Sequence, residues 1–130
     1  MKTIQVVAAV IREGDAVFAT ARGYGAYKGQ WEFPGGKIED GETPEQALTR
    51  EIREELDTQI RVGQRIGCIE YDYPTFHLSM ECFWCTIVSG ELVLKEAQDC
   101  RWLRADTLYS VDWLPADRLL LDAIAQGLHN

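Results

Sequence analysis

Three glutamates with helical spacing are the residues of this sequence whose arrangement suggests chemistry most directly. Glu51, Glu54 and Glu55 stand at positions i, i+3 and i+4, so on an α-helix their carboxylates lie within an arc of about 100°. The adjacent apolar stripe, which we expect to face the core, consists of Leu48, Ile52 and Leu56. Like charges at the edge of a buried surface repel one another, and a cation removes this cost. Carboxylate oxygens favour Mg²⁺ or Mn²⁺, hard ions that also bridge to substrate phosphates.

An acidic helix face can also be an ordinary solvated surface, supported here by an Arg50–Glu54 pair at i, i+4. The neighbouring sequence favours the metal site. Gly35-Gly36 offers a backbone that a ligand can approach closely, and Glu42 supplies another carboxylate just before the helix.

The helix that must carry these glutamates is predicted over residues 44–56. Thr43 is a typical N-cap, Pro44 occupies the first helical position, and Gln46 completes a T-x-x-Q capping box. These local signals fix where the helix begins and therefore which residues share its faces.

The other elements follow from β-rich runs separated by turn residues. A hairpin is expected within residues 1–22, followed by a glycine-rich loop over 23–30. The remaining expected elements are a short strand at 31–33 that ends in the Pro34-Gly35-Gly36 turn, strands at 60–73, 77–89 and 100–103, and a closing helix at 115–127. This mixed order predicts an α+β fold, an α/β/α sandwich with helices on both sides of a mixed β-sheet.

Composition limits the classes of function. The 130 residues, 46% of them hydrophobic, suit one domain over residues 1–130. A net charge of −8 argues against a duplex nucleic acid partner. The first apolar run is too short to span a membrane and has no cleavage site, so we expect no membrane association and a cytoplasmic location. The four cysteines are expected to be free thiols; a redox or zinc role for Cys82 and Cys85 is the alternative.

Residues 36–58, GKIEDGETPEQALTREIREELDT, resemble the Nudix box G-x5-E-x7-R-E-U-x-E-E-x-G-U, where U is aliphatic. The matching positions are Gly36, Glu42, Arg50, Glu51, Ile52, Glu54 and Glu55. The departures are Asp57, where the pattern has glycine, and Thr58, where it has an aliphatic residue. Both departures affect the turn after the helix rather than the metal site.

The resemblance extends over nearly the whole chain to the MutT-type branch of the Nudix hydrolases. It is carried by WEFPGGKIEDGETPEQA, EYDYP at 70–74, Lys95-Glu96 and LPAD at 114–117. This branch includes enzymes described as 8-oxo-dGTP diphosphatases and CTP pyrophosphohydrolases. The resemblance implies an α/β/α sandwich that uses Mg²⁺ to hydrolyse a nucleoside triphosphate to the monophosphate and pyrophosphate.

The resemblance also implies roles for individual residues. The expected metal ligands are Glu51, Glu54, Glu55, Glu96 and the carbonyl of Gly36. Glu96 could instead be an exposed loop residue. Because the chain has only two histidines, a carboxylate is expected to be the general base, either Glu51 or Glu54. Arg50 is expected to orient these carboxylates and to pair with Glu42.

Substrate contacts are expected from two groups of residues. Arg22 and Lys37 would bind the phosphates, unless they are plain surface charges. The base pocket would be formed by Phe33, Tyr73, Phe76 and Asp117. The alternatives are a core position for the aromatic residues and a helix-start position for Asp117. His77 is expected to make a structural hydrogen bond.

An ionised Asp117 would select bases that donate hydrogen bonds, so 8-oxo-dGTP ranks first and CTP or 5-methyl-dCTP second. We therefore predict nucleotide-pool sanitisation, linked to DNA repair, by a monomer or homodimer. The alternatives are a non-catalytic nucleotide-sensing module and an acidic cation-buffering protein. Retention of all four box glutamates argues against the former, and the Gly-Gly turn argues against the latter.

Overall fold

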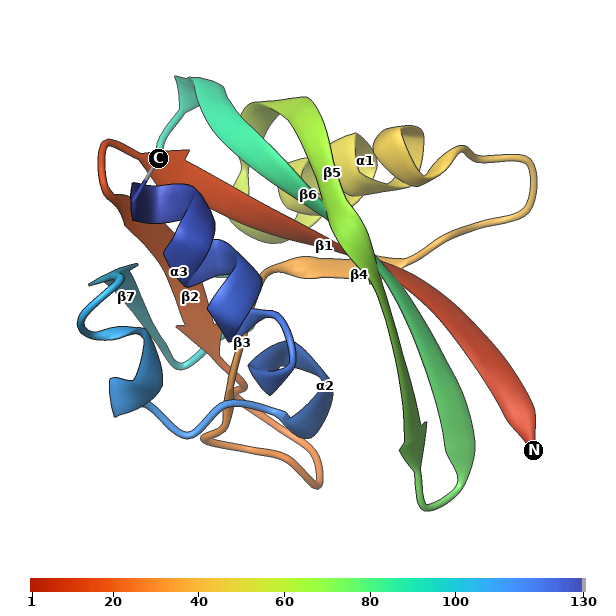
Figure 1. Cartoon of the computed structure of the whole chain (residues 1–130). Coiled ribbons are helices and arrows are strands. Elements are labelled where there is room, and N and C mark those ends of the chain that lie inside the picture. The colour runs from red at the N-terminus through yellow and green to blue at the C-terminus, as the bar shows by residue number, and fades with distance from the viewer. Residues whose placement is uncertain (130) are drawn as a thin grey trace.

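The fold is a mixed β-sheet with helices on both faces, as the computed structural model shows for residues 1–129 (Figure 1). The strands are β1 (Lys2–Glu13), β2 (Ala16–Ala21), β3 (Trp31–Glu32), β4 (Gly35–Lys37), β5 (Thr58–Tyr73), β6 (Phe76–Gly90) and β7 (Asp99–Arg104). The helices are α1 (Pro44–Leu56), α2 (Pro115–Arg118) and α3 (Leu121–His129), with one 3₁₀ turn, η1 (Leu108–Ser110). The predicted α+β fold class is confirmed.

Strand β1 organises the sheet, whose main order is β3-β2-β1-β6-β5. β1 pairs in parallel with β6 and antiparallel with β2 and β4, while β7 pairs with β2. β5 and β6 form a long antiparallel hairpin. β1 therefore joins β4, which precedes α1, to the β5–β6 hairpin, which follows it.

Alternating residues of β1 face two separate cores. Val7, Ala9 and Ile11 pack with the apolar face of α1, whereas Ala8 and Val10 pack with α2 and α3. Figure 1 shows α1 and the α2–α3 pair on opposite sides of the sheet. This arrangement is the expected result of period-two alternation in a strand that is buried on both faces.

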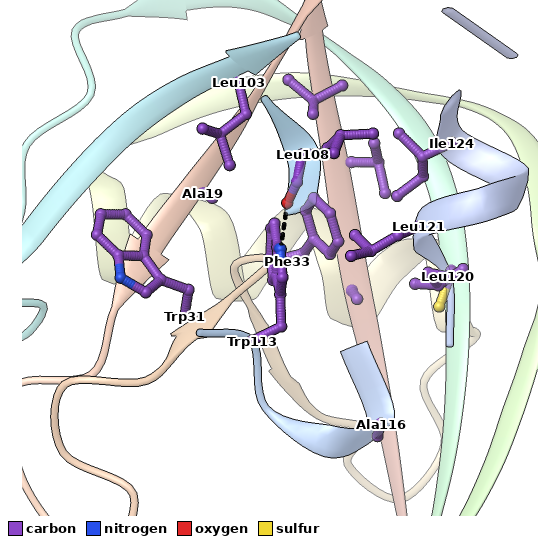
Figure 2. Close-up of a cluster of buried hydrophobic side chains, with 14 of the residues drawn as sticks. Ala19, Trp31, Phe33, Leu103, Leu108, Trp113, Ala116, Leu120, Leu121 and Ile124 are labelled. Carbon is purple, nitrogen blue, oxygen red and sulfur yellow. Dashed lines mark hydrogen bonds between the residues drawn. The ribbon is translucent and has the colours of Figure 1, made fainter. Parts of the chain in front are cut away.

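The core on the α2–α3 side of the sheet lies against the pocket described below. Phe33 stacks on Trp113 with ring centroids 4.6 Å apart, and the indole nitrogen of Trp113 donates to the Leu108 carbonyl at 2.6 Å (Figure 2). Backbone bonds from Trp31 N to Asp112 O and from Leu114 N to Trp31 O join β3 to this segment. The Phe33 ring is therefore fixed by the buried ring of Trp113.

Two expectations about local structure were wrong. Gly35-Gly36 is part of β4 rather than a turn, and a Cβ at Gly35 would lie 1.9 Å from the Val7 carbonyl oxygen. At Gly35 the missing side chain therefore leaves room for β1 and not for a ligand. The closing helix is split in two because Leu119 and Leu120 donate to carbonyls three residues back, which tightens the backbone and ends α2.

The cysteines behave as expected. All four are free thiols, and Cys82 and Cys85 lie in the two different cores, on opposite faces of β6. Burial raises the pKa of the Cys85 thiol to about 12. In residues 1–129 no helix has the length and apolar character to cross a membrane.

Candidate active site

The three glutamates of the predicted metal site project from α1, whose start is as predicted. Thr43 Oγ1 accepts from Gln46 N at 3.1 Å, and the Gln46 side chain accepts from Thr43 N at 3.0 Å. This capping box fixes the helical register. The buried face consists of Ala47, Leu48, Ile52 and Leu56. The glutamates consequently lie at the border between this apolar face and the solvent.

Glu51 rests against the backbone of β4. Its side chain is only 16% exposed, and a Cβ added to Gly36 would lie 2.3 Å from its carboxyl carbon. Only glycine therefore fits at position 36 while Glu51 keeps this position. The close approach that the sequence suggested for a ligand is used, in this structure, by a carboxylate.

Arg50 connects the carboxylates of the box. Its guanidinium makes two bonds to Glu42, at 2.7 and 2.9 Å, and single bonds to Glu51 at 2.9 Å and Glu54 at 3.2 Å. It also donates to the Lys37 carbonyl at 3.1 Å. The predicted Arg50–Glu42 pair is confirmed. The fork geometry of arginine allows one side chain to hold all three carboxylates.

Glu55 points away from this network into the adjacent pocket. Burial, followed by the charges of Glu51, Glu32 and Glu96, raises the pKa of Glu55 to about 8. Three neighbouring carboxylates thus disfavour the charged form of Glu55. Their mutual repulsion is the condition that a bound cation relieves.

The donor set fits a hard divalent cation. It consists of carboxylate oxygens beside a glycine backbone, and it lacks the nitrogen and sulfur ligands that softer metals prefer. Within residues 1–129 no group of three or more His, Cys, Asp or Glu side chains is already gathered in metal-binding geometry. In this structure Glu51 and Glu54 bond to Arg50, and Glu96 accepts from the Tyr24 hydroxyl at 3.3 Å.

A cavity of about 390 Å³ opens beside these carboxylates, a size typical of small-molecule sites. Nine of the predicted site residues line it: Gly36, Glu55, Glu96, Arg22, Lys37, Phe33, Tyr73, Phe76 and Asp117. The remaining three, Arg50, Glu51 and Glu54, lie outside its lining, on α1. The structure therefore brings the predicted phosphate-binding and base-binding residues together in one cavity.

The aromatic side of the cavity combines packing with exposure to the cavity. Tyr73 and Phe76 stack with ring centroids 5.1 Å apart, and Tyr27 meets Tyr73 edge to face at 5.7 Å. The Tyr73 hydroxyl accepts from Ala116 N at 3.2 Å. These rings thus belong to the core, or pack against it, and line the cavity as well, so a core position does not exclude the predicted contact with a base.

Asp117 lies deep in the cavity and is 5% exposed. Its Oδ2 accepts from Phe33 N at 2.9 Å, which ties α2 to the end of β3. Burial raises the pKa of Asp117 to about 7, against the lowering effect of that hydrogen bond. Burial thus disfavours the ionised form on which the sequence-based prediction for Asp117 rests, and the sequence does not reveal how deeply this side chain is buried.

Sequence reasoning missed Glu32 and gave Tyr24 no role. Glu32 Oε2 accepts from Arg22 Nε at 3.0 Å, so it fixes the arginine that was predicted to bind phosphate. Burial raises the pKa of Glu32, and Arg22 opposes that rise. One signal was present: Glu32 is an acid between the aromatic residues Trp31 and Phe33, an unusual place for a charge without a partner.

Known proteins resemble this chain over most of its length. An 8-oxo-dGTP diphosphatase of Escherichia coli (strain K12) is 36% identical, covering 90% of this chain and 92% of that protein. A CTP pyrophosphohydrolase of the same organism is 34% identical, covering 95% and 92%. The solution structure of the E. coli ORF135 protein superimposes with a TM-score of 0.84 at 31% identity, covering 99% of this chain and 92% of that one. Residues 1–126 match the NUDIX domain, and the chain therefore belongs to the NUDIX domain family.

Proposed function

We propose that this chain, acting as one domain, hydrolyses a (deoxy)nucleoside triphosphate to the monophosphate and pyrophosphate. The observation that carries this proposal is the carboxylate cluster of α1 beside a cavity that has both cationic and aromatic walls. The substrate proposed first is 8-oxo-dGTP, and the alternative is CTP or 5-methyl-dCTP. The two E. coli relatives, named 8-oxo-dGTP diphosphatase and CTP pyrophosphohydrolase, support these candidates. The protein is proposed to act on the cytoplasmic nucleotide pool, as a monomer or a homodimer.

Nudix hydrolases in general need a divalent cation, typically Mg²⁺. In this chain the proposed ligands are Glu51, Glu54, Glu55, Glu96 and the Gly36 carbonyl. Mn²⁺ is the alternative to Mg²⁺ at this site. When bound, the cation neutralises the triphosphate and lowers the pKa of the attacking water. The raised pKa of Glu55, caused by burial and by neighbouring carboxylates, supports this assignment.

The remaining chemistry comes from the side chains of the network. Arg50 holds Glu51 and Glu54 in fixed orientations. Either glutamate is proposed to accept the proton of the attacking water, and Glu51 is the less exposed of the two, at 16% against 60%. Proton acceptance by a positioned carboxylate contributes about 10²- to 10⁴-fold to such reactions.

The cavity residues are proposed to bind the nucleotide. Arg22, fixed by Glu32, and Lys37 would contact the phosphates. Phe33, Tyr73 and Phe76 would contact the base. Because Oδ2 of Asp117 accepts from Phe33 N, its Oδ1 is the atom that remains for a base edge.

Turnover of a defined nucleotide panel tests the proposal. The chain is incubated with Mg²⁺ and 8-oxo-dGTP, dGTP, CTP, 5-methyl-dCTP or UTP, and the products are separated. Monophosphate and pyrophosphate are expected in equal amounts, with none when Mg²⁺ is chelated. Release of orthophosphate would contradict the reaction type. Binding of a nucleotide without turnover of any would favour the non-catalytic sensing module.

Substitution of Asp117 tests the base contact. Asp117→Ala is expected to cost about 1–3 kcal/mol in kcat/KM for the preferred base and less for UTP, because uracil offers only one donor. An equal loss on every triphosphate would assign Asp117 to the structure of the pocket and not to base selection.

A further inference from the structure

A histidine lies between two carboxylates near the closed end of the β5–β6 hairpin. His77 Nδ1 is 2.6 Å from Asp72 Oδ1, and His77 Nε2 is 2.7 Å from Glu70 Oε1. Asp72 stands directly opposite His77 in the strand register. The imidazole therefore links β6 to two positions on β5.

The same polar face extends along the hairpin and holds Glu70 in place. Glu70 Oε2 accepts from Ser79 Oγ at 2.9 Å and from Cys68 Sγ at 3.2 Å. Because Glu70 is bonded by groups on both strands, the ring of His77 meets a carboxylate whose orientation is already set.

The opposite face of this hairpin end forms the aromatic wall of the cavity. Tyr73 and Phe76 are the register pair next to Asp72 and His77, one step closer to the turn. Adjacent residues on a strand point to opposite faces. The two pairs are therefore successive steps of one ladder, with Tyr73 and Phe76 lining the cavity and Asp72 and His77 facing away from it.

This end of the hairpin extends beyond the helices in Figure 1. Glu70 and Asp72 are exposed, at 54% and 71% of their side-chain surface. On the outer face of the hairpin end, polar side chains rather than a packed core connect the two strands beyond the backbone ladder. The ring bonds of His77 are the cross-strand side-chain hydrogen bonds of this face that lie next to the aromatic pair.

Both ring nitrogens of His77 face a carboxylate oxygen, so both must donate for both bonds to form. Only the imidazolium carries two N–H donors. The charged groups that face the ring, Asp72 and Glu70, both come from β5, and Thr3, its neighbour on β1, carries no charge. In accordance with this arrangement, hydrogen bonds from Asp72 and then Glu70 raise the pKa of His77 above its ordinary value.

We propose that His77 is a positioning residue for nucleotide binding: its cationic ring ties β5 to β6 and so holds Tyr73 and Phe76 as the wall of the cavity. That the cavity binds a nucleotide rests on the proposed function. The connection of β5 to β6 through the two ring bonds of His77, called the tie below, does not depend on it. The stabilising effect is fully present below the ordinary pKa of histidine and is lost as the pH rises through the raised pKa of His77.

The kinetic test compares wild type with His77→Gln at each pH between 6 and 9, using whichever panel nucleotide is turned over. The glutamine cannot titrate, so effects of pH on other groups cancel in the ratio of the two proteins. The KM of His77→Gln is expected to exceed that of wild type about threefold at pH 6 and to equal it at pH 9, with a constant kcat ratio. A KM ratio that does not change with pH, or a change in kcat alone, would overturn the proposal.

His129→Gln is the matched control, because His129 is the other histidine of the chain. It is expected to follow wild type at every pH. Asp72→Asn keeps His77 and an acceptor oxygen but removes one of the two negative charges that favour the imidazolium, so it should reduce the pH effect on KM. A pH effect in Asp72→Asn as large as in wild type would contradict the tie.

Amide hydrogen exchange tests the tie without any substrate. Amides of residues 70–79 are expected to be about threefold better protected in wild type than in His77→Gln at pH 6, and equally protected at pH 9. Equal protection at pH 6 would overturn the tie. If no nucleotide is turned over by any variant, the proposed function fails, while the exchange result still decides on the tie.

Discussion

The carboxylate network on α1 and the cavity beside it differ in how far apart in the chain their residues lie. In the network, Arg50 reaches Glu42 over eight positions and Glu54 over four. In the cavity, Phe33 N meets Asp117 across 84 positions, and the Tyr73 hydroxyl meets Ala116 across 43. The network thus lies within residues 37–54, whereas the cavity exists only when segments from β1 to α2 come together.

The two regions also differ in solvent exposure. The network is partly open to water, with Glu54 60% exposed, whereas Asp117 is 5% exposed. The exposed charge of Glu54 can therefore be changed at little cost in stability, whereas a charge on the buried Asp117 affects folding itself. This contrast predicts that substitution of Glu54 acts on turnover alone, whereas substitution of Asp117 also acts on stability.

The largest expected effect is that of Glu54→Gln in the network. The amide keeps the volume of the side chain but removes a proposed metal-ligating charge, so turnover is expected to fall at least about 100-fold. The melting temperature should change little, because the loss of the exposed Arg50–Glu54 ion pair offsets the relief of repulsion between the carboxylates. Glu45→Gln, an exposed site on the same helix, serves as the control and should retain full activity. Near wild-type turnover at low Mg²⁺ would contradict the metal assignment.

In the cavity, Asp117→Asn is expected to change how stability depends on pH. The pKa of Asp117 is raised to about 7 by burial, so its favourable contribution is present below about pH 4 and is lost as the pH rises to about 7. The free energy of unfolding of the variant, relative to that of wild type, should therefore rise by on the order of 2 kcal/mol from pH 4 to pH 8. Urea unfolding at both pH values measures this difference. A difference that is the same at both would show that Asp117 does not titrate in the native protein over this range.

Arg50→Lys tests whether the fork of the guanidinium, and not only its charge, organises the network. An ammonium group has three donors on a single nitrogen, so it cannot reproduce the five hydrogen bonds that the Arg50 guanidinium makes. The Mg²⁺ concentration for half-maximal turnover is expected to rise about tenfold. Arg53→Lys, on the exposed side of the same helix, should leave it unchanged. Equal behaviour of the two variants would mean that Arg50 contributes charge alone.

The smallest effect is expected at the end of α1. Asp57 adopts the left-handed conformation at φ 52° and ψ 38°, the conformation that glycine would take without strain. Asp57→Gly is therefore expected to raise the melting temperature slightly, corresponding to about 0.5–1 kcal/mol, with unchanged turnover. A decrease in the melting temperature would show that the Asp57 side chain stabilises this turn.

The second departure from the box has a structural explanation. The Thr58 hydroxyl is buried and lies 2.9 Å from the Leu56 carbonyl and 3.0 Å from the Glu91 carbonyl. It can therefore occupy an apolar position without leaving a polar group unsatisfied. It also links the end of α1 to the segment that leads to Glu96.

The sequence by itself determined the features that depend on neighbouring residues. Thr43, Pro44 and Gln46 set the start of α1, and that start places the box glutamates on one stripe. The alternation of β6 places Cys82 and Cys85 on opposite faces. Such features are readable because helix and strand geometry fixes the relative direction of side chains a few positions apart.

Only the tertiary structure decided the features that depend on burial. The raised pKa of Asp117, the Arg22–Glu32 pair inside the cavity and the pairing of Gly35 with β1 all arise between segments that are distant in the chain or that meet across the sheet. Burial depends on which distant segments cover a side chain, and local sequence carries no measure of that coverage. For this reason the arrangement of the box residues on α1 could be predicted from the sequence, whereas the electrostatics of the cavity could not.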